Sequence, residues 1–399
     1  MNICYLIRSF STQAGTESYV YNMSMALARL GHNVHIVSLA GKGRRDFKGL
    51  EGGIFIHHLD FKQEPFRGSR LLERVVPLFI WRYGNLINNI LPDLINTHAI
   101  DIIEATDWGI DAWAYLPKRK VPVCVRLHGY PGFKDDFDRG ILHKWPKNYF
   151  LWSLFRNHLL GADLVTAVSN SYTDFARNAW ELKARDVKLI PISVNFNIFH
   201  PADISRENQA ILFVGRLEKS KGIEVLAQAT PLVLKEFPRA RFYLAGQDYN
   251  HRDSQQTWSQ YLIKVFGEER IIYLGSLPTQ ELVHYYQHAT ICVVPSLYEP
   301  GGTVVFEAMA CGCPVIASKV GGLVEIIKDR QTGLLIQPAT GQALADASIE
   351  LLRQPLLRHA LAQNALESMR AGYDINNIAQ QTLDAYRQTI DCFKTRKPL

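Results

Sequence analysis

The sequence lacks long apolar runs, and this absence limits the class of protein to which it can belong. Within its 399 residues, no apolar stretch approaches the roughly 18–20 residues that a helix needs to cross a bilayer. The opening stretch, MNICYLIRSFSTQAGTES, is apolar only over residues 3–7, which we interpret as a buried strand and not as a signal peptide. We therefore expect a cytoplasmic protein.

Cysteine is scarce, and its spacing matches no known ligand pattern. The six cysteines stand at positions 4, 124, 292, 311, 313 and 392, and none has the spacing of a zinc ligand set or of a Cys-x-x-Cys redox motif. We interpret them as reduced thiols inside a core, as is usual in the cytoplasm, and expect no disulfide.

The composition is that of a globular protein with room for two cores, since 47% of the residues are hydrophobic and 21% are charged. The net charge of +6 comes from the first half: residues 1–200 contain 24 Lys and Arg against 18 Asp and Glu, whereas residues 201–399 contain 20 of each. A basic N-terminal half suits an anionic partner, such as a phosphorylated acceptor or an acidic membrane surface. A solvated face with surplus lysine and arginine explains the excess equally well.

Short apolar runs alternate with amphipathic stretches along the chain, a pattern typical of α/β proteins with mainly parallel sheets. In the first half we predict a helix at 16–30 and strands at 3–7, 34–38, 54–57, 102–104, 121–127, 164–168 and 188–190. In the second half we predict strands at 211–214, 241–245, 271–274, 291–295, 315–317, 324–327 and 333–336. Helices are predicted there at 222–237, 279–288, 304–311, 343–353, 356–369 and 375–393.

These two series of elements predict two Rossmann-like domains, each built on a doubly wound parallel sheet. The stretch VKLIPISVNFNIFHP loses periodicity and marks a hinge near 192–208. We therefore place one domain at 1–195, a second at 205–374 and a final helical segment at 375–399. Two such sheets in tandem leave an interdomain cleft, and ligands bind at the carboxyl ends of their strands.

The stretch EPGGTVVFEAMACGCPVIAS places two carboxylates where burial would be costly. Glu299 precedes the pair Gly301-Gly302, which allows backbone to approach a ligand, and we expect Thr303 to be the N-cap of the next helix. Glu307 lies in the first turns of that helix among apolar residues. A buried carboxylate there suits a diol, whose two hydroxyls can donate to its two oxygens. A place on the exposed stripe of the helix, or a pair with a nearby lysine, is the alternative.

A second motif, FVGRLEKSKGIEVL, gathers positive charge at the end of a strand. The strand ends at Gly215, and Arg216 and Lys221 follow across a short turn into a helix. Two cations beside a helix N-terminus suit a pyrophosphate, to which arginine gives a forked contact and lysine a point charge. Surface charge before a helix is the alternative.

Together these motifs resemble the signature of the family 4 glycosyltransferases, whose usual text is close to E-P-F-G-x-x-x-x-E-A-M-A-x-G-x-P-V-I-A, with G-R-L-x-x-x-K-G before it. Here Gly301 stands where phenylalanine is commoner. The resemblance follows the chain over 2–380 and is strongest over 211–337. It implies a GT-B fold, with an acceptor-binding domain at 1–195 and a nucleotide-sugar-binding domain at 205–374. It also implies that the last helix, within 375–399, crosses back to the N-terminal domain.

The same resemblance implies a set of donor-binding residues. Arg216 and Lys221 would hold the diphosphate, Glu307 would bind the ribose hydroxyls, and Glu299 would lie beside the donor sugar. The further donor-binding residues, which meet the sugar or the base mainly through backbone, are Gly301, Gly302, Thr303, Val304, Val305, Gly246, Ser276 and Leu277. We expect no cofactor and no metal, because Arg216 and Lys221 can balance the charge that develops on the leaving diphosphate.

In the N-terminal domain, the loop STQAGTES keeps one glycine and the acid of the family's Gly-Gly-x-Glu. Gly15 is therefore expected near the donor phosphate or the acceptor, although Ala14 replaces the other glycine; a plain turn before a helix is the alternative. His128, in VRLHGYPGF, follows a predicted strand and by resemblance contacts the donor sugar; a structural histidine is the alternative. We count His128 as catalytic, together with the residues Glu299, Arg216 and Lys221.

The stretch IIEATDWG supplies Glu104 and Asp107, which we predict as acceptor contacts. Charges at the edge of a core are the alternative. Two other stretches, FRGSRLLERVVPLFIWRYGN and HKWPKNYFLWSLFRNH, combine aromatic residues with lysine and arginine. They can lie at a membrane interface, or they can pack a helix onto the domain with its charges outward. Peripheral contact with the inner face of a membrane is therefore an expectation.

The resulting hypothesis is a retaining glycosyltransferase that moves a hexose from a nucleotide-sugar donor, UDP-glucose being favoured over a GDP-sugar. The expected acceptor is a glycan or lipid-linked molecule in exopolysaccharide biosynthesis, and no nucleic-acid partner is expected. The alternatives are a nucleotide-sugar epimerase, an NAD-dependent oxidoreductase and a two-domain sugar-binding protein. An oxidoreductase would have Gly-x-Gly-x-x-Gly after the first strand, where this sequence has SFSTQAG.

Overall fold

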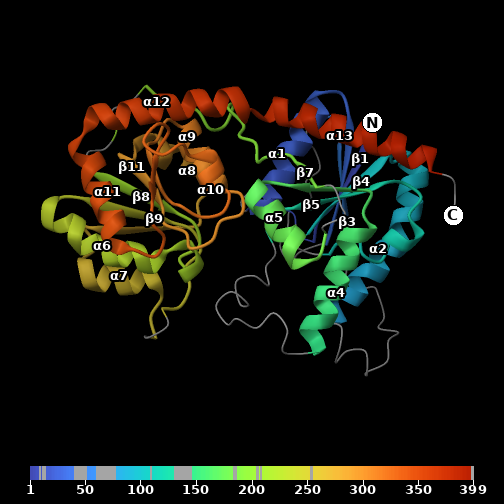
Figure 1. Cartoon of the computed structure of the whole chain (residues 1–399), viewed down its shortest axis with the longest axis horizontal. Coiled ribbons are helices and arrows are strands. Elements are labelled where there is room, and N and C mark those ends of the chain that lie inside the picture. Colours follow the sequence, from blue (N-terminus) through green and yellow to red (C-terminus); the bar gives the residue numbers. More distant parts are fainter. Residues whose placement is uncertain are drawn as a thin grey trace. The chain divides into compact units, whose positions relative to one another are not determined.

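The computed structural model describes residues 1–8, 10, 15–39, 52–59, 78–107, 110–129, 146–182, 187–203, 206, 209–251 and 255–396. The chain forms two compact units, the first made of Met1–Pro191 with Asn376–Leu399 and the second of Ile192–Ile375 (Figure 1). Each unit contains one parallel sheet with helices on its faces. No helix among the described residues is long and apolar enough to span a bilayer.

The first unit is built on a seven-stranded sheet in the order β3-β2-β1-β4-β5-β6-β7. Short runs such as NICYL are buried almost completely, as a sheet covered on both faces requires. The strand order reverses direction between β1 and β4, which makes this pair the switch point of a doubly wound sheet. The strands are β1 Asn2–Leu6, β2 Asn33–Leu39, β3 Ile54–Leu59, β4 Ile102–Thr106, β5 Val123–Leu127, β6 Leu164–Ala167 and β7 Lys188–Leu189.

The helices of this unit include one from the very end of the chain. Tyr386 of the final helix donates a hydrogen bond to Glu104 of β4, so the last helix is fastened to the first sheet. The helical elements are α1 Gly15–Arg29, α2 Leu78–His98, η3 Leu116–Lys118, α4 Pro146–Gly161, α5 Asn170–Ala179 and α13 Ile375–Thr395, which Figure 1 labels except for η3.

The two basic-aromatic stretches fall partly on described residues. Residues 66–77 and 143–145 lie outside them, whereas the remainder forms the start of α2 and most of α4. Tyr83 of α2 and Phe155 of α4 are fully buried. These contacts favour the alternative in which the helices pack onto their own unit, and membrane contact stays a prediction.

The second unit is built on a six-stranded sheet in the order β10-β9-β8-β11-β12-β13. The neighbouring residues Leu212 and Phe213 of β8 pack into different apolar clusters, because successive side chains of a strand point to opposite faces of the sheet. The strands are β8 Ala210–Val214, β9 Arg241–Ala245, β10 Ile271–Gly275, β11 Ile291–Val294, β12 Val315–Ser318 and β13 Leu334–Ile336. The helical elements are η4 Lys219–Lys221, α6 Ile223–Glu236, α7 Trp258–Phe266, α8 Thr279–His288, α9 Thr303–Ala310, α10 Leu323–Ile326, α11 Gly341–Arg353 and α12 Pro355–Gly372.

One predicted strand of this unit is wrong. Residues 324–327, expected to complete the sheet because they are rich in β-branched side chains, belong mainly to the short helix α10. The backbone N–H of Ile327 donates to the carbonyl of Leu323, which closes a helical turn, and Leu323 and Ile326 are buried by it. Burial of these two positions three residues apart overrides the strand propensity of the run.

The six cysteines are all free, as the sequence predicted. Five are buried, but Cys392 is exposed, contrary to the expectation of a core thiol. It lies near the end of α13, where most of the last residues of the helix face solvent.

Candidate active site

The predicted donor-binding residues of the second unit collect at one edge of its sheet. The strand order reverses between β8 and β11, and the loops that follow these neighbouring parallel strands emerge together. The loop after β8 carries Arg216 and Lys221, and the loop after β11 carries Glu299. Ligands of doubly wound sheets bind at such a reversal, so the two motifs stand where the sequence predicted a ligand site.

An ion pair joins the two motifs directly. The ammonium group of Lys221 lies 2.6 Å from Oε2 of Glu299, and the two side chains are only 25% and 14% exposed. The other carboxylate oxygen, Oε1, accepts a hydrogen bond of 3.3 Å from the backbone N–H of Gly302. A charged pair held this firmly at the edge of the sheet places a lysine and a glutamate in fixed positions for a ligand.

The loops can approach this closely because Gly222 has no side chain. Gly222 follows Lys221 with φ of 78°, and a Cβ atom there would lie 1.9 Å from the carbonyl oxygen of Pro295 at the end of β11. The backbone N–H of Leu297 also donates to the carbonyl of Ser220 at 2.9 Å. The glycine in the sequence K-G is therefore a steric requirement for the Lys221–Glu299 pair.

Arg216 is the more accessible of the two cations. Its side chain is 47% exposed, and its guanidinium lies 3.0 Å from the carboxylate of Glu218. Glu218 is 4% exposed and also accepts a hydrogen bond from the hydroxyl of Ser220 at 2.6 Å. Glu218 was not singled out from the sequence, and it holds the arginine in place while leaving donors of the guanidinium free to bind an anion.

Glu307 lies on α9 in a half-buried position, with a tyrosine as its partner. The hydroxyl of Tyr286 in α8 donates to Oε2 of Glu307 at 2.8 Å. Burial raises the pKa of Glu307 to about 7, and the hydrogen bond from Tyr286, which acts in the opposite direction, limits this rise. Among the described residues the partner is therefore a tyrosine and not the lysine that the sequence left open. No spacing rule indicates Tyr286, because it comes from a different helix.

The start of α9 differs from the prediction in one respect. Thr303 is the first helical residue and not the N-cap, because Gly302 occupies the cap position with φ of 74°. The carbonyl of Gly302 accepts the first helical hydrogen bond, from the N–H of Val305 at 2.8 Å. The left-handed conformation of the cap is easy for glycine and costly for threonine, which explains the shift by one residue. The N–H groups of Thr303 and Val304 precede this bond, so they have no partner within the helix and can bind a ligand.

The predicted base-binding residues lie at the same edge of the sheet. Gly246 follows β9, and its backbone N–H donates to the carbonyl of Gly275 at the end of β10, at 2.7 Å. Ser276 and Leu277 follow directly, Ser276 exposed and Leu277 half-buried. The carboxyl ends of β8, β9, β10 and β11 thus present all the predicted donor-binding residues of this unit along one edge.

Substitution of Gly246 by alanine is expected to disrupt this edge. Gly246 has φ of 141°, and a Cβ atom there would lie 2.0 Å from the carbonyl oxygen of Gly215. We expect Gly246→Ala to lower the free energy of unfolding by about 2–3 kcal/mol, measured by chemical denaturation. Gly372→Ala is the matched control, since a Cβ atom there meets nothing within 4 Å. Equal stability of the two variants would contradict the packing described.

In the first unit, Asp107 and His128 follow the neighbouring strands β4 and β5. Asp107 is fully buried and accepts hydrogen bonds from the N–H of Gly129 at 3.2 Å and from the hydroxyl of Tyr172 at 3.1 Å. Burial raises the pKa of Asp107 to about 6. The other predicted residue of this edge, Gly15, is exposed and begins α1, whereas Ala14 lies outside the described residues.

His128 is held as a neutral imidazole. Its ring lies 4.7 Å from the ring of Tyr19, and burial, followed by the charge of Arg126, lowers the pKa of His128 well below its usual value. Its Nε2 atom has no hydrogen-bond partner in the part of the chain that the structure describes. A neutral imidazole with one unsatisfied nitrogen can accept or donate one hydrogen bond to a sugar hydroxyl.

Glu104 lies in the interior and not at a binding edge. Its oxygens accept hydrogen bonds from Tyr19 at 3.0 Å and from Tyr386, and it is 1% exposed. Arg126 is fully buried beside it, with its guanidinium 4.4 Å from the ring of Tyr19 and bonded to the carbonyls of Ile190 and Pro191. These contacts favour the structural alternative for Glu104 over acceptor binding.

The metal-free reaction stays a prediction. The sequence contains one Asp-x-Asp, Asp136-Phe137-Asp138, and it lies outside the described residues.

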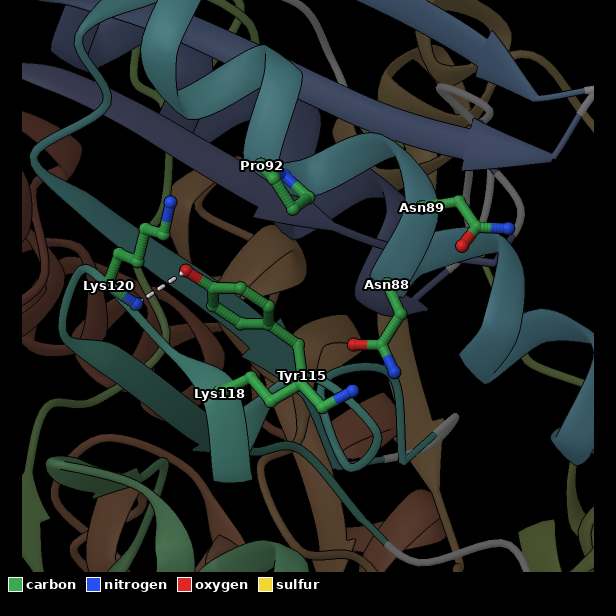
Figure 2. A pocket seen from close by; sticks show the side chains of 6 residues that line it. All are labelled: Asn88, Asn89, Pro92, Tyr115, Lys118 and Lys120. Atoms are coloured by element: carbon green, nitrogen blue, oxygen red, sulfur yellow. Dashed lines mark hydrogen bonds between the residues drawn. The ribbon is translucent and has the colours of Figure 1, made fainter.

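Figure 2 shows a small pocket of the first unit, formed by α2 and the segment around η3, where the backbone N–H of Lys120 donates to the hydroxyl of Tyr115 at 2.9 Å. None of the predicted site residues lines this pocket.

Comparisons with known proteins agree with the two motifs. The family model described as Glycosyltransferase Family 4 matches residues 14–197, and the model described as Glycosyl transferases group 1 matches residues 195–368. An uncharacterized glycosyltransferase of Methanocaldococcus jannaschii is 34% identical over 42% of this chain and 41% of its own length. The D-inositol 3-phosphate glycosyltransferase of Corynebacterium aurimucosum is 40% identical over 36% of this chain and 35% of its own length. The matches thus span less than half the length of these first curated relatives.

Solved structures resemble the whole chain. Sucrose-phosphate synthase from Thermosynechococcus elongatus has a TM-score of 0.79 at 24% identity and covers 98% of this chain and 99% of its own. Anabaena HepE in complex with UDP-glucose has a TM-score of 0.70 at 19% identity and covers 97% of this chain and 100% of its own. These likenesses confirm the predicted fold, a GT-B arrangement of two parallel-sheet α/β units.

Proposed function

The chain belongs to the family 4 glycosyltransferases, and from this premise we propose that it transfers a hexose from a nucleotide-sugar donor to a glycan or lipid-linked acceptor. UDP-glucose or a similar UDP-hexose is the favoured donor. The observation that carries the proposal is the ion pair of Lys221 with Glu299, which joins the two family motifs where the strand order of the second sheet reverses.

Charge and shape at this edge fit a nucleoside diphosphate. Arg216 and Lys221 supply two cations, and the N-terminus of α9 adds N–H groups that favour an anion. Glu307 offers a carboxylate to the ribose diol, and the hydroxyl of Tyr286 holds one oxygen of this carboxylate in place. The solved structure of HepE is a complex with UDP-glucose, which supports a uridine donor.

The proposed chemistry is transfer with retention at the anomeric carbon. The bond from that carbon to the diphosphate oxygen breaks, a bond to the acceptor oxygen forms on the same face, and the departing phosphate takes the acceptor proton. Arg216 and Lys221 balance the charge that develops on the diphosphate, and this electrostatic help is the main contribution of the chain to the step. The roles of His128 and Asp107 beside the sugar and acceptor stay predictions.

The acceptor class is proposed from the name of a relative. A fission yeast relative, 25% identical over 81% of this chain, is named phosphatidylinositol N-acetylglucosaminyltransferase, a name that contains a lipid. A lipid-linked acceptor, and peripheral contact of the basic first half with an acidic membrane surface, are therefore kept in the proposal. Exopolysaccharide biosynthesis, which we expected from the sequence, belongs to the same proposal.

A nucleotide panel tests the proposal. The melting temperature of the chain is measured in EDTA with UDP, GDP, ADP, NAD or free sugars. A ligand that binds only the folded state raises it, by more the further the ligand concentration exceeds Kd. Stabilisation by UDP, with release of UDP from UDP-glucose when an acceptor extract is added, is the expected result. Stabilisation by NAD alone would overturn the assignment in favour of an oxidoreductase, and a response only to free sugar would favour a sugar-binding protein.

Glu299→Gln is expected to separate binding from transfer. The variant keeps the shape of the side chain and removes the charge that holds Lys221, so UDP binding should change by less than about threefold while transfer falls by about 100-fold or more. Titration calorimetry and a transfer assay measure the two effects. Glu367→Gln, an exposed acid of α12, is the control and should change neither. Parallel loss of binding and transfer in Glu299→Gln would contradict the role assigned.

A further inference from the structure

Three histidines of the first unit form a cluster that the proposed function does not use. We propose that His35, His57 and His98 bind one divalent transition-metal ion, with Zn²⁺ as the preferred ion. His35 lies on β2, His57 on β3 and His98 at the end of α2, so the cluster joins two strands and a helix. One ligand atom from each residue lies within 4.8 Å of the other two.

The strand register explains why the histidines meet. His57 pairs with Val37 in the parallel ladder, and His35 is two residues before Val37 on the same strand. Residues two apart on a strand share a face, so His35 and His57 lie on the same face of the sheet. Nδ1 of His35 lies 3.0 Å from Nε2 of His57, and the ring of His98 lies 4.5 Å from that of His35 and 5.5 Å from that of His57. Ligand nitrogens about 2.0–2.1 Å from a tetrahedral zinc ion are roughly 3.3 Å apart, a spacing that small side-chain rotations reach from here.

The surroundings favour an ion over a purely structural cluster. His35 is 2% exposed, so its ring is held in a fixed position by the side chains packed around it. His57 and His98 are half-buried, which leaves a path for an ion and room for a water as fourth ligand. One face of the His35 ring is covered by Phe55, whose ring centroid lies 4.8 Å away.

Three imidazoles with an open fourth position are a typical donor set for Zn²⁺, and they also bind Co²⁺, Ni²⁺ or Cu²⁺. His35 is near the start of β2, and His98 precedes β4, so the cluster lies toward the amino ends of the strands. Asp107 and His128 lie at the opposite, carboxyl ends. The ion would therefore fasten the edge strand β3 and α2 to the sheet and stabilise the first unit, independently of sugar transfer.

The chain contains its own control for nonspecific metal binding. His284 and His288 stand one turn apart on α8, with ring centroids 3.8 Å apart. This pair offers two imidazoles to an ion, and among the described residues no third ligand completes it. Removal of His284 should thus leave binding at the three-histidine cluster intact.

The test uses the full chain purified without a polyhistidine tag, stripped with EDTA and dialysed. Titration calorimetry with ZnCl₂ at pH 7.5 should show one strong site per chain, and Zn²⁺ should raise the melting temperature. His57→Gln and His98→Gln should each weaken this site at least 100-fold, whereas His284→Gln should change it less than threefold. Substitution with Co²⁺ gives visible bands that report a tetrahedral nitrogen site and its loss in the variants.

Two results would overturn the proposal. One is the absence of uptake by the unmodified chain at 100 µM ZnCl₂, a result that does not depend on any variant folding. The other is undiminished binding in a chain carrying both His57→Gln and His98→Gln, whose folding is checked by circular dichroism. Neither result bears on sugar transfer, because stabilisation by UDP in EDTA is measured separately.

Discussion

Replacement of Lys221 by methionine is expected to lower kcat/KM for sugar transfer by about 10²–10³-fold. Methionine keeps most of the length of the side chain but removes the ammonium group that lies 2.6 Å from Glu299. The diphosphate then loses one of its two cations, both in the bound state and as negative charge develops on the leaving group. Loss of one fixed electrostatic contact to a transition state typically has an effect of this size.

A second effect places the expected loss toward the upper end of this range, because Glu299 is then left without its cation. Its carboxylate is 14% exposed, so little water replaces the ammonium group. A negative charge without its partner also repels the incoming diphosphate. The double variant Lys221→Met/Glu299→Gln should therefore bind UDP more tightly than Lys221→Met alone, while its transfer rate stays low.

Lys219→Met is the matched control for this prediction. Lys219 lies in the same short helical turn, η4, two residues before Lys221, and carries the same charge. Its removal changes the net charge of the loop equally, and we expect less than a threefold effect on transfer. If the two methionine variants lost activity equally, general attraction of the anion would explain the data and the specific pairing with Glu299 would be wrong.

Binding of UDP-glucose is expected to tighten about tenfold between pH 6 and pH 8. Glu307 has a pKa raised to about 7 by burial, so at pH 6 it is mostly protonated and at pH 8 mostly ionised. The ionised form accepts both ribose hydroxyls, so bound nucleotide lowers its pKa, and affinity is lost as pH falls through 7. UDP-glucose is used because its diphosphate, unlike a terminal phosphate, has no ionisation near pH 6.

Two variants identify the titrating group. Glu307→Gln should bind weakly at both pH values and lose the pH dependence, because its amide does not titrate. Tyr286→Phe removes the hydroxyl that donates to Oε2 of Glu307, so the pKa should rise further and the transition should move to higher pH. Calorimetry across pH 5.5–8.5 measures both. A wild-type affinity that is flat over this range, or a transition that survives in Glu307→Gln, would contradict the assignment of the diol.

The sequence contained most of the information needed for the fold and for the donor motifs. The run RFYLA predicted a strand, and the residues after Gly215 predicted a short turn into a helix. The error at α10 arose because three apolar residues have the same composition in a strand and in a helical turn. Only burial against neighbouring elements distinguishes them.

The pairings inside the site could not be predicted in the same way. Lys221 and Glu299 are 78 residues apart, and Tyr286 and Glu307 are 21 apart, so no local periodicity connects them. They meet because parallel strands align their carboxyl ends and because α8 packs beside α9. Glu104 shows the opposite case. The sequence left acceptor contact and a charge at the edge of a core open, and the buried contacts of Glu104 with Tyr19 and Tyr386 favour the second.

The most direct test of the account is a crystal structure of the chain with bound UDP-glucose. It should show the diphosphate within hydrogen-bond distance of Arg216 and Lys221, the ribose hydroxyls on Glu307, and the hexose beside Glu299 at the start of α9. A nucleotide bound elsewhere, or one from which Arg216, Lys221 and Glu307 all point away, would contradict the central claim.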